Sequence, residues 1–548
     1  MGIYACDFET TTDIDDCRVW AIGIYNIETE QFHYGNNIDF FFNYSSRVEQ
    51  SKFYFHNLKF DGSFILSYLL KNNYTYVKDK KINKNQFTTL ISDRGVFYSI
   101  KICFSNGCTI TILDSLKILP FKVSQISKAF NLTDEKLEID YKKTRPINYQ
   151  LTLAEIKYLK NDTVIVGKAL KILFEQGLKK MTQGSNALAD YKMILGKKQF
   201  KRYFPPPYYH EDVKKAYKGG YTYLNPKYKE RIVGKGVVLD VNSLYPSVMY
   251  KNELPYGEPI YFEGKYKPDN KFSLYVQRFT CHFELKKGYL PTIQIKNSFR
   301  YVGTEYLTDS KDEDVTLTLT NIDMDLFFTH YNVYNIQFHD GYKFKSTNQL
   351  FTDYIDKWIE IKITSEKEGN SSMRTLAKLM LNSLYGKFGT NPRVQSKFPY
   401  LEEDIVKYHL HEEEFKKPLY IPVAAFVTAH ARYITISSAQ KNYDRFIYAD
   451  TDSLHLEGEH LPDLNISSYD LGAWKVESIF TKAKFIRAKT YIEQINNELK
   501  VTVAGMPTSC HEFVTFDNFN VGQSYGGKLR SKVVNGGTVL LDTLFTIN

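Results

Sequence analysis

Residues 237–247 read Val-Val-Leu-Asp-Val-Asn-Ser-Leu-Tyr-Pro-Ser, and this stretch decides the architecture of the second half of the chain. The apolar run predicts a buried strand that ends on Asp240, and Pro246 predicts that a helix starts directly afterwards. An acid at the end of such a strand lies at an edge of the sheet and not in its core. We therefore expect Asp240 to belong to a site.

A second acidic segment, Tyr448-Ala-Asp-Thr-Asp-Ser453, follows about two hundred residues later. It predicts a strand-turn-strand over 445–456, with Asp450 and Asp452 at the tip. Taken alone, an Asp-x-Asp pair fits an ordinary turn. If Asp240 joins the pair, three crowded carboxylates repel one another unless cations neutralise them. The pattern favours a divalent metal site.

The first 180 residues carry a separate group of acids. Short apolar runs at 3–8, 19–25, 53–55 and 109–113 alternate with helical patterns at 61–70 and 153–174, which is typical of an α/β unit. Asp7 and Glu9 leave the same face of a strand. Asp61 stands where a strand gives way to a helix, and capping that helix is its alternative role. Tyr158 and Asp162 share one helix face.

The helical region 350–388 has one polar face. At about 100° per residue, Arg374, Lys378, Asn382 and Tyr385 fall within an arc of roughly 80°. Two cations suit a triphosphate, and an aromatic ring beside Gly386 suits a base pair. A solvated basic face is the alternative.

Composition limits the class of protein. A chain of 548 residues exceeds the roughly 100 to 200 of one domain, so several domains are expected. The net charge of +9 is compatible with a polyanionic partner. Six cysteines form no C-x-x-C pair, which argues against disulfides and zinc. Without a secretory signal or a run of 18 apolar residues, we expect a soluble cytoplasmic protein with no membrane partner.

The order Asp-x-Glu, Asn-x-x-x-Asp, Tyr-x-x-x-Asp resembles the three exonuclease motifs of DnaQ-like enzymes. Segments 237–247 and 448–453 resemble motifs A and C of family B DNA polymerases, and 378–386 resembles motif B. Segments 55–62, 376–388 and 514–519 bring the chain nearest to the protein-primed family B DNA polymerases of small tailed phages, the phi29 type.

The resemblance implies an α/β and α+β multidomain fold, with an RNase H-like (DnaQ-like) exonuclease domain and a right-hand polymerase domain carrying two family-specific insertions. The stiff 204–209 stretch marks the change between halves. The expected divisions are 1–183 exonuclease, 184–251 first part of the palm, 252–348 first terminal-protein region, 349–390 fingers, 391–417 second terminal-protein region, 418–503 second part of the palm and 504–548 thumb.

For the exonuclease, the resemblance implies that four acids hold two metal ions: Asp7, Glu9, Asp61 and Asp162. Tyr158 would orient the attacking water, and Lys136 resembles a further catalytic lysine, with a solvated surface lysine as its alternative. The frayed single strand would be held by Thr10, His56, Asn57, Phe60, Ser115, Leu116 and Tyr141. Phe60 has a core residue as its alternative.

For the polymerase, the resemblance implies that Asp240, Asp452 and the Val241 carbonyl bind the metals while Asp450 supports them. Tyr245 would exclude a ribose 2′-hydroxyl. The incoming nucleotide would contact Lys362, Arg374, Lys378, Asn382 and Tyr385. Primer and template would contact the Tyr-x-Gly-Gly motif and the Lys-x-Tyr motif, through Tyr217, Gly219, Gly220, Gly386, Lys489 and Tyr491.

The implied enzyme is a replicative DNA-directed DNA polymerase with a 3′→5′ proofreading exonuclease, using two Mg²⁺ ions per site, with Mn²⁺ as the alternative metal. Protein priming, processivity and strand displacement follow from the resemblance. Expected partners are template and primer DNA, dNTPs, a terminal protein and a single-stranded DNA-binding protein, in the host cytoplasm. Two other readings are an RNA- or DNA-primed family B polymerase and a catalytically silent DNA-binding relic.

Overall fold

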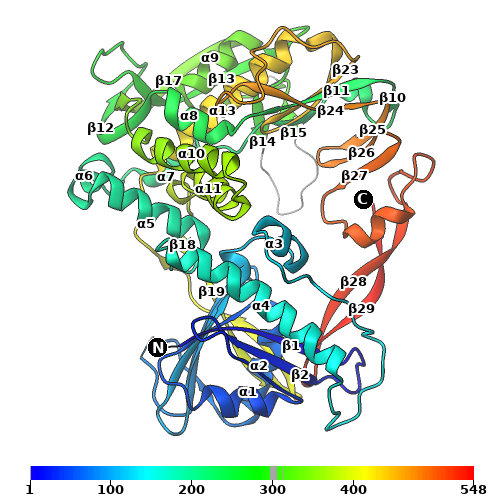
Figure 1. Ribbon diagram of the computed structural model, residues 1–548. Coiled ribbons are helices and arrows are strands. Elements are labelled where there is room, and N and C mark those ends of the chain that lie inside the picture. The colour runs from blue at the N-terminus through cyan, green and yellow to red at the C-terminus, as the bar shows by residue number, and fades with distance from the viewer. Residues whose placement is uncertain (1, 80, 296–304, 312) are drawn as a thin grey trace.

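A ten-stranded sheet forms the N-terminal part of the computed structural model, which describes residues 2–79, 81–295, 305–311 and 313–548 (Figure 1). Its order is β20-β19-β6-β7-β8-β4-β1-β2-β3, with β5 beside β6, and β1, β4 and β8 run parallel to one another. The strands are β1 Ile3–Thr10, β2 Val19–Asn26, β3 Phe32–Gly35, β4 Lys52–Phe55, β5 Thr75–Tyr76, β6 Gln86–Ser92, β7 Phe97–Cys103, β8 Thr109–Asp114, β19 Ser396–Glu402 and β20 Ile405–Leu410. The expected α/β unit is confirmed.

Helices cover both faces of this sheet. Helix α4 (Leu153–Glu175) packs on β1 and β2, while α1 (Ile38–Ser45) and α2 (Leu58–Lys71) cover the other side. Because side chains alternate along a strand, Asp7 and Glu9 share the α4 face of β1 with buried Ala5. Asp61 lies inside the first turn of α2, whose N-cap position is Asn57, so helix capping is not its role.

The second half is built on an antiparallel sheet ordered β24-β11-β23-β22-β9. Helix α13 (Ile421–Lys441) is apolar on nearly all sides and packs against this sheet. Pro422 lies in its first turn, where a backbone N–H would have no partner within the helix, so proline is tolerated there. The elements around it are β9 Thr222–Leu224, β11 Gly236–Val241, α8 Leu244–Lys251, α10 Thr352–Lys367, α11 Ser371–Ser383, α12 Tyr385–Phe388, β22 Phe446–Asp450, β23 Ser453–Glu457 and β24 Trp474–Phe480.

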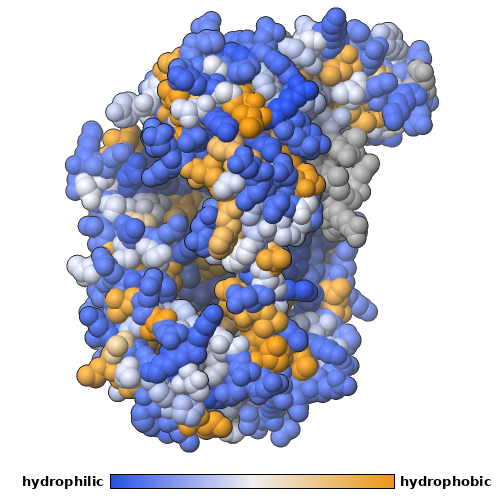
Figure 2. Space-filling model, turned by 90° about the vertical axis from the view of Figure 1, so that its right-hand side faces the viewer, coloured by the Kyte–Doolittle hydropathy of each residue, from blue (hydrophilic) through white to orange (hydrophobic). Residues whose placement is uncertain are grey.

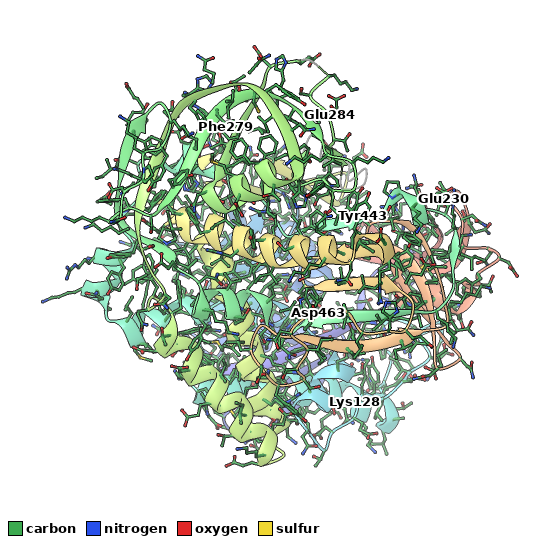
Figure 3. All side chains as sticks on the ribbon, turned by 90° about the horizontal axis from the view of Figure 1, so that it is seen from above. Lys128, Glu230, Phe279, Glu284, Tyr443 and Asp463 are labelled. Carbon is green, nitrogen blue, oxygen red and sulfur yellow. The ribbon has the colours of Figure 1, made fainter. Side chains whose placement is uncertain are left out.

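The region predicted as the first insertion forms a sheet of its own, ordered β12-β17-β13-β16 with helix α9. Viewed from above, this sheet, marked by Phe279 and Glu284, lies on one side of α13, and the loop with Asp463 lies on the other (Figure 3). Ten residues of this region, 296–304 and 312, lie outside the described part. Its elements are β12 Leu254–Glu263, β13 Leu274–Leu285, β14 Ile293–Ile295, β15 Glu305–Leu307, β16 Val315–Thr320, α9 Asn321–His330 and β17 Tyr331–Thr347.

Two later segments reach back to the N-terminal sheet. Strand β19, from the predicted second insertion, pairs with β6 through Ser396 and Ser92. The C-terminal hairpin of β28 (Ser524–Val534) and β29 (Gly537–Thr546) packs on α2, where Gly537 faces the Phe64 ring. Figure 2 shows the face that carries this hairpin, with a recess between the upper and lower parts and apolar groups separated by hydrophilic surface.

The remaining elements connect these parts. A four-stranded sheet is ordered β10-β25-β26-β27, and its last three strands lie between β24 and the C-terminal hairpin in sequence. Among the described helices, none combines the length and apolarity needed to cross a bilayer. The other elements are α3 Val123–Ala129, α5 Gln183–Leu195, α6 Lys197–Tyr203, α7 His210–Lys214, β10 Ile232–Val233, β18 Arg393–Val394, β21 Glu414–Phe415, β25 Lys482–Arg487, β26 Thr490–Ile495 and β27 Glu498–Val503.

Candidate active sites

Three carboxylates of the first cluster meet in the described structure. One oxygen each from Asp7, Glu9 and Asp162 lies within 4.8 Å of the others. Burial, together with Asp162, raises the pKa of Asp7 to about 7, while Lys136 opposes the rise. The pKa of Glu9 is also raised, first by burial and then by its acidic neighbours. These groups repel as anions, so a cation would relieve the site.

One oxygen of Asp162, Oδ1, is buried and has no hydrogen-bond partner in the part of the chain that the structure describes. An orphaned carboxylate oxygen beside two further acids is the donor set that Mg²⁺ or Mn²⁺ accepts. The adjoining cavity has a volume of about 760 Å³ and extends to the C-terminal hairpin at Leu540. The first cluster therefore fits a divalent ion.

Asp61 stands close to this trio but outside its 4.8 Å group. It is 4% exposed, and burial followed by the charge of Asp7 raises its pKa. The four predicted acids thus share one electrostatic environment, with three in immediate contact.

Lys136 and two tyrosines complete the cluster. The Lys136 ammonium forms an ion pair with Asp162 and lies 3.3 Å from the Tyr158 hydroxyl. The Tyr158 and Tyr141 hydroxyl oxygens are 2.7 Å apart. Lys136 is therefore not a free surface lysine. Burial and nearby carboxylates raise the pKa of Tyr158, which keeps its hydroxyl protonated.

Most of the residues predicted to hold single-stranded DNA line this cavity or the neighbouring one, namely Thr10, His56, Asn57, Phe60 and Tyr141. His56 bonds Ser115 Oγ at 3.0 Å and the Phe121 carbonyl at 2.7 Å. Ser115 has no exposed surface, and its hydroxyl donates to the Phe55 carbonyl at 3.0 Å; its role as a DNA contact stays a prediction. The others, Thr10, Asn57, Phe60 and Leu116, lie at the end of β1, the start of α2 and the turn after β8. Phe60 lines the neighbouring cavity and packs on Phe64 with 5.6 Å between ring centroids, and its contact with DNA stays a prediction.

The second cluster lies at one end of the β24-β11-β23-β22 sheet. Asp240 pairs across the strands with Ser453, which places it beside the Asp450 to Asp452 tip in a cavity of about 510 Å³. Burial, followed by Asp452, raises the pKa of Asp240 to about 7, and burial also raises that of Asp452. The Val241 N–H donates to the Asp452 carbonyl at 2.8 Å, and this bond joins the end of β11 to the turn between β22 and β23.

The nucleotide-binding residues predicted on α11 lie on its accessible face. Leu376, Ala377, Met380 and Leu381 are buried, whereas Lys378 and Asn382 are exposed and Arg374 is half-buried. Burial, followed by the charge of Arg374, lowers the pKa of Lys362 on α10, so these two cations lie near each other. Tyr385 stacks on Tyr245 with ring centroids 4.1 Å apart.

The Tyr-x-Gly-Gly motif touches both the acidic tip and the C-terminal end of α12. A Cβ on Gly220 would lie 2.5 Å from Thr451 Oγ1, between the two acids. The Gly219 carbonyl accepts from buried Arg432 at 2.8 Å, and the Tyr217 hydroxyl abuts Gly389. Tyr491 and Lys489 line the polymerase cavity, whereas Gly386 has open space around it.

Lys475 was missed by sequence reasoning. It pairs with Asp240 across β24 and β11, and its charge acts on Asp240, Lys362 and Lys378. It belongs to none of the motifs, and only the register of the sheet reveals its position.

Comparisons with known proteins agree with this arrangement. The family described as DNA polymerase type B, organellar and viral, matches residues 43–153 and 134–471. The DNA polymerase of Bacillus phage phi29 is 47% identical over 100% of this chain and 99% of its own length. That of Streptococcus phage Cp-1 is 35% identical over 99% and 98%.

Solved structures give the same result. Phi29 DNA polymerase complexed with primer-template DNA and incoming nucleotide substrates matches with a TM-score of 0.94 and 46% identity, over 100% of both chains. The same polymerase complexed with single-stranded DNA matches with a TM-score of 0.93 and 45% identity. The chain belongs to the type B DNA polymerases, and within them to the phi29-type enzymes. The multidomain α/β fold and the DNA polymerase class expected from the sequence are confirmed.

Proposed function

We propose that this polymerase is a protein-primed replicative enzyme that proofreads its product with a 3′→5′ exonuclease. The observation that carries the proposal is the presence of two separate carboxylate clusters on two different sheets of one chain. The divisions proposed are those expected from the sequence, from exonuclease at 1–183 to thumb at 504–548. A silent relic is disfavoured because every predicted acid is present at its cluster.

At the editing site, Asp7, Glu9, Asp61 and Asp162 would hold two divalent ions, Mg²⁺ in the cell. When bound, such ions supply an activated water and stabilise the leaving 3′ oxygen. The chain's own groups do the positioning. The protonated Tyr158 hydroxyl, fixed by Tyr141, would orient the attacking water, and Lys136 holds Asp162 in place.

At the synthetic site, Asp240, Asp452 and the Val241 carbonyl would be the metal ligands, while Asp450 is held by Lys489. Arg374, Lys378 and Lys362 present cations to the triphosphate, and Asn382 borders them. The stacked Tyr245 and Tyr385 form a flat wall under the sugar and base, where a 2′-hydroxyl would clash.

Priming by a terminal protein is proposed from the full-length similarity to phi29-type enzymes and the separate sheet of the first insertion. Processivity and strand displacement are proposed from the segments 391–417 and 524–546, which both reach the exonuclease sheet. A single-stranded DNA-binding protein would cover the displaced strand in the host cytoplasm.

The test separates the two activities. Asp452→Asn is expected to abolish dNTP incorporation while primer degradation persists, and Asp7→Ala to do the reverse. Asp444→Asn, an exposed acid six residues before Asp450, is the matched control and should change neither. If one substitution removed both activities from a folded protein, the two-site proposal would be wrong.

Protein priming needs its own experiment. With the cognate partner and no oligonucleotide, the wild-type enzyme is expected to attach dNMP covalently to the partner. Absence of the adduct, with primer extension intact, would instead favour an oligonucleotide-primed polymerase.

A further inference from the structure

The segment between α3 and α4, residues 130–152, has no helix or strand, yet it lies along α4 in a fixed order. As the segment advances, its contacts move back along the helix toward the helix N-terminus, except for one forward step of a single residue from Asn161 to Asp162. In sequence order these contacts are Asp134 with Lys168, the Glu135 carbonyl with Asn161, Lys136 with Asp162, Tyr141 with Tyr158 and Arg145 with Glu155. The segment therefore places Lys136 and Tyr141 at the editing site.

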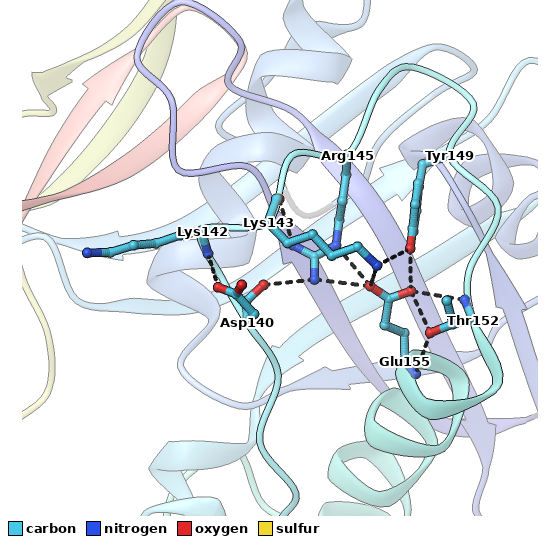
Figure 4. Close-up of polar contacts among 7 residues, drawn as sticks. All are labelled: Asp140, Lys142, Lys143, Arg145, Tyr149, Thr152 and Glu155. Carbon is cyan, nitrogen blue, oxygen red and sulfur yellow. Dashed lines mark hydrogen bonds and ion pairs between the residues drawn. The ribbon is translucent and has the colours of Figure 1, made fainter.

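The last contact of this series is the most deeply buried. Arg145 is 4% exposed and Glu155 is 6% exposed. Arg145 Nε donates to Glu155 Oε1 at 3.1 Å (Figure 4). The guanidinium carbon of Arg145 lies 3.9 Å from the centre of the Trp20 ring. Another guanidinium nitrogen donates to the Asp140 carbonyl at 2.9 Å. Arg145 thus fixes the backbone directly before Tyr141.

Glu155 is fixed equally well on its other oxygen. Oε2 accepts hydrogen bonds of 2.9 Å from the Thr152 N–H, the Thr152 hydroxyl and the Tyr149 hydroxyl (Figure 4). Burial raises its pKa, but these bonds and Arg145 outweigh burial and lower the pKa of Glu155 to about 2. Glu155 is therefore an anion with two roles: it caps the N-terminus of α4, and it binds the 130–152 segment through Arg145.

Glu155 lies on the same face of α4 as the editing residues. At about 100° per residue, Glu155, Tyr158 and Asp162 fall within an arc of roughly 60°. One helix face therefore carries both Glu155, which holds the segment, and the side chains of Tyr158 and Asp162, which the segment contacts. Displacing Glu155 would let Tyr141 leave Tyr158, because Tyr141 is half exposed and has few other restraints.

We propose that Arg145 and Glu155 are positioning residues of the editing site. They hold the 130–152 segment so that Tyr141 and Lys136 stay against Tyr158 and Asp162. The inference rests on the exonuclease proposed above. Neither residue touches the reacting atoms, so both act through the geometry of the segment.

The experiment measures kcat and KM for degradation of a single-stranded oligonucleotide, with primer extension by the same preparation. Arg145→Ala is expected to lower the kcat of degradation on the order of 10- to 100-fold, as loss of orienting partners does elsewhere, with a much smaller change in KM and normal extension. In a Lys136→Ala background the further loss should shrink, because both changes act on one geometry.

Lys171→Ala is the matched control, since it removes the cation of an exposed ion pair with Glu30 on the same helix. It should leave degradation unchanged. Normal degradation by Arg145→Ala, or a loss that stays the same in the Lys136→Ala background, would overturn the proposal. A wild-type enzyme that degrades no DNA would refute the exonuclease itself, which is a separate result.

A milder variant guards against misfolding. If Arg145→Ala also loses primer extension, Tyr149→Phe offers a smaller change, because it removes only the hydroxyl that donates to Glu155 and accepts from the Lys143 ammonium. Selective slowing of degradation by Tyr149→Phe would support the positioning role, and unchanged degradation would overturn it.

Discussion

The ammonium of Lys489 lies 2.7 and 2.5 Å from the two carboxylate oxygens of Asp450. The Tyr448 hydroxyl also donates to Asp450, at 3.2 Å, and accepts from the Lys489 N–H at 2.9 Å. Asp450 is therefore neutralised by the chain itself. Within the described residues Asp240 and Asp452 have no such cation within 4.0 Å, which agrees with their proposed role as metal ligands.

Lys489→Ala should weaken synthesis more than editing. Without the ammonium, the Asp450 charge would repel Asp452 and draw cations away from their proper position. We expect kcat/KM for primer extension to fall by about tenfold or more, which corresponds to about 1.4 kcal/mol. Single-strand degradation should persist. Lys235→Ala, an exposed lysine paired with Glu459, is the control, and equal losses in both variants would contradict the assignment.

The stability of the metal-free enzyme should fall as pH rises from about 4 to about 7. Burial raises the pKa of Asp7 and of Asp240 from 3.8 to about 7, so in this window the folded chain binds more protons than the unfolded chain. In EDTA, Tm should be lower at pH 7.5 than at pH 5.5, and Mg²⁺ should raise it more at pH 7.5. The double variant Asp7→Asn with Asp240→Asn should show a flatter profile, and an unaltered profile would refute the account.

Gly220→Ala should impair synthesis through Thr451. The new Cβ would lie 2.5 to 2.9 Å from three Thr451 atoms. Thr451 cannot retreat easily, because its N–H donates to Tyr221 and its carbonyl accepts from Thr435. We expect extension to fall on the order of tenfold, with degradation retained. Gly234→Ala, which meets nothing within 4 Å, is the control.

Gly537→Val should loosen the C-terminal hairpin from α2. A Cβ there would lie 2.4 Å from the Phe64 ring, closer than real contacts allow. We expect shorter products per binding event when extension is measured with a DNA trap, while incorporation of a single nucleotide stays normal. Gly526→Ala, which makes an ordinary 3.8 Å contact with Phe513, should behave as wild type. Unchanged product length for Gly537→Val would show that this contact does not retain DNA.

Local sequence patterns predicted the elements that carry the acids. The apolar strand before Asp240, the pair Asp7 and Glu9, and the helix carrying Asp162 all lie where periodicity places them. These features depend on neighbours within a few residues, and strand alternation or helical periodicity reports them directly.

Contacts between distant segments could not be read in the same way. These contacts depend on how the chain folds back on itself. They include the pairing of β19 with β6, the position of Lys475 opposite Asp240, and the packing of the Arg145–Glu155 pair against Trp20. Neither periodicity nor residue spacing records the register between strands hundreds of residues apart. Likewise, the sequence showed Ser115 as a small polar residue, and only burial revealed that it faces inward.

The pairing of β19 with β6 limits how the enzyme can be divided. A fragment that stopped at residue 183 would leave the backbone of β6 unpaired at Ile91 and Ser92, and would uncover the apolar surface on which Val406 packs. Exposed strand edges recruit other strands, so such a fragment should self-associate. The editing half is therefore not an exchangeable module: transplanting it into another polymerase requires the 396–410 hairpin as well.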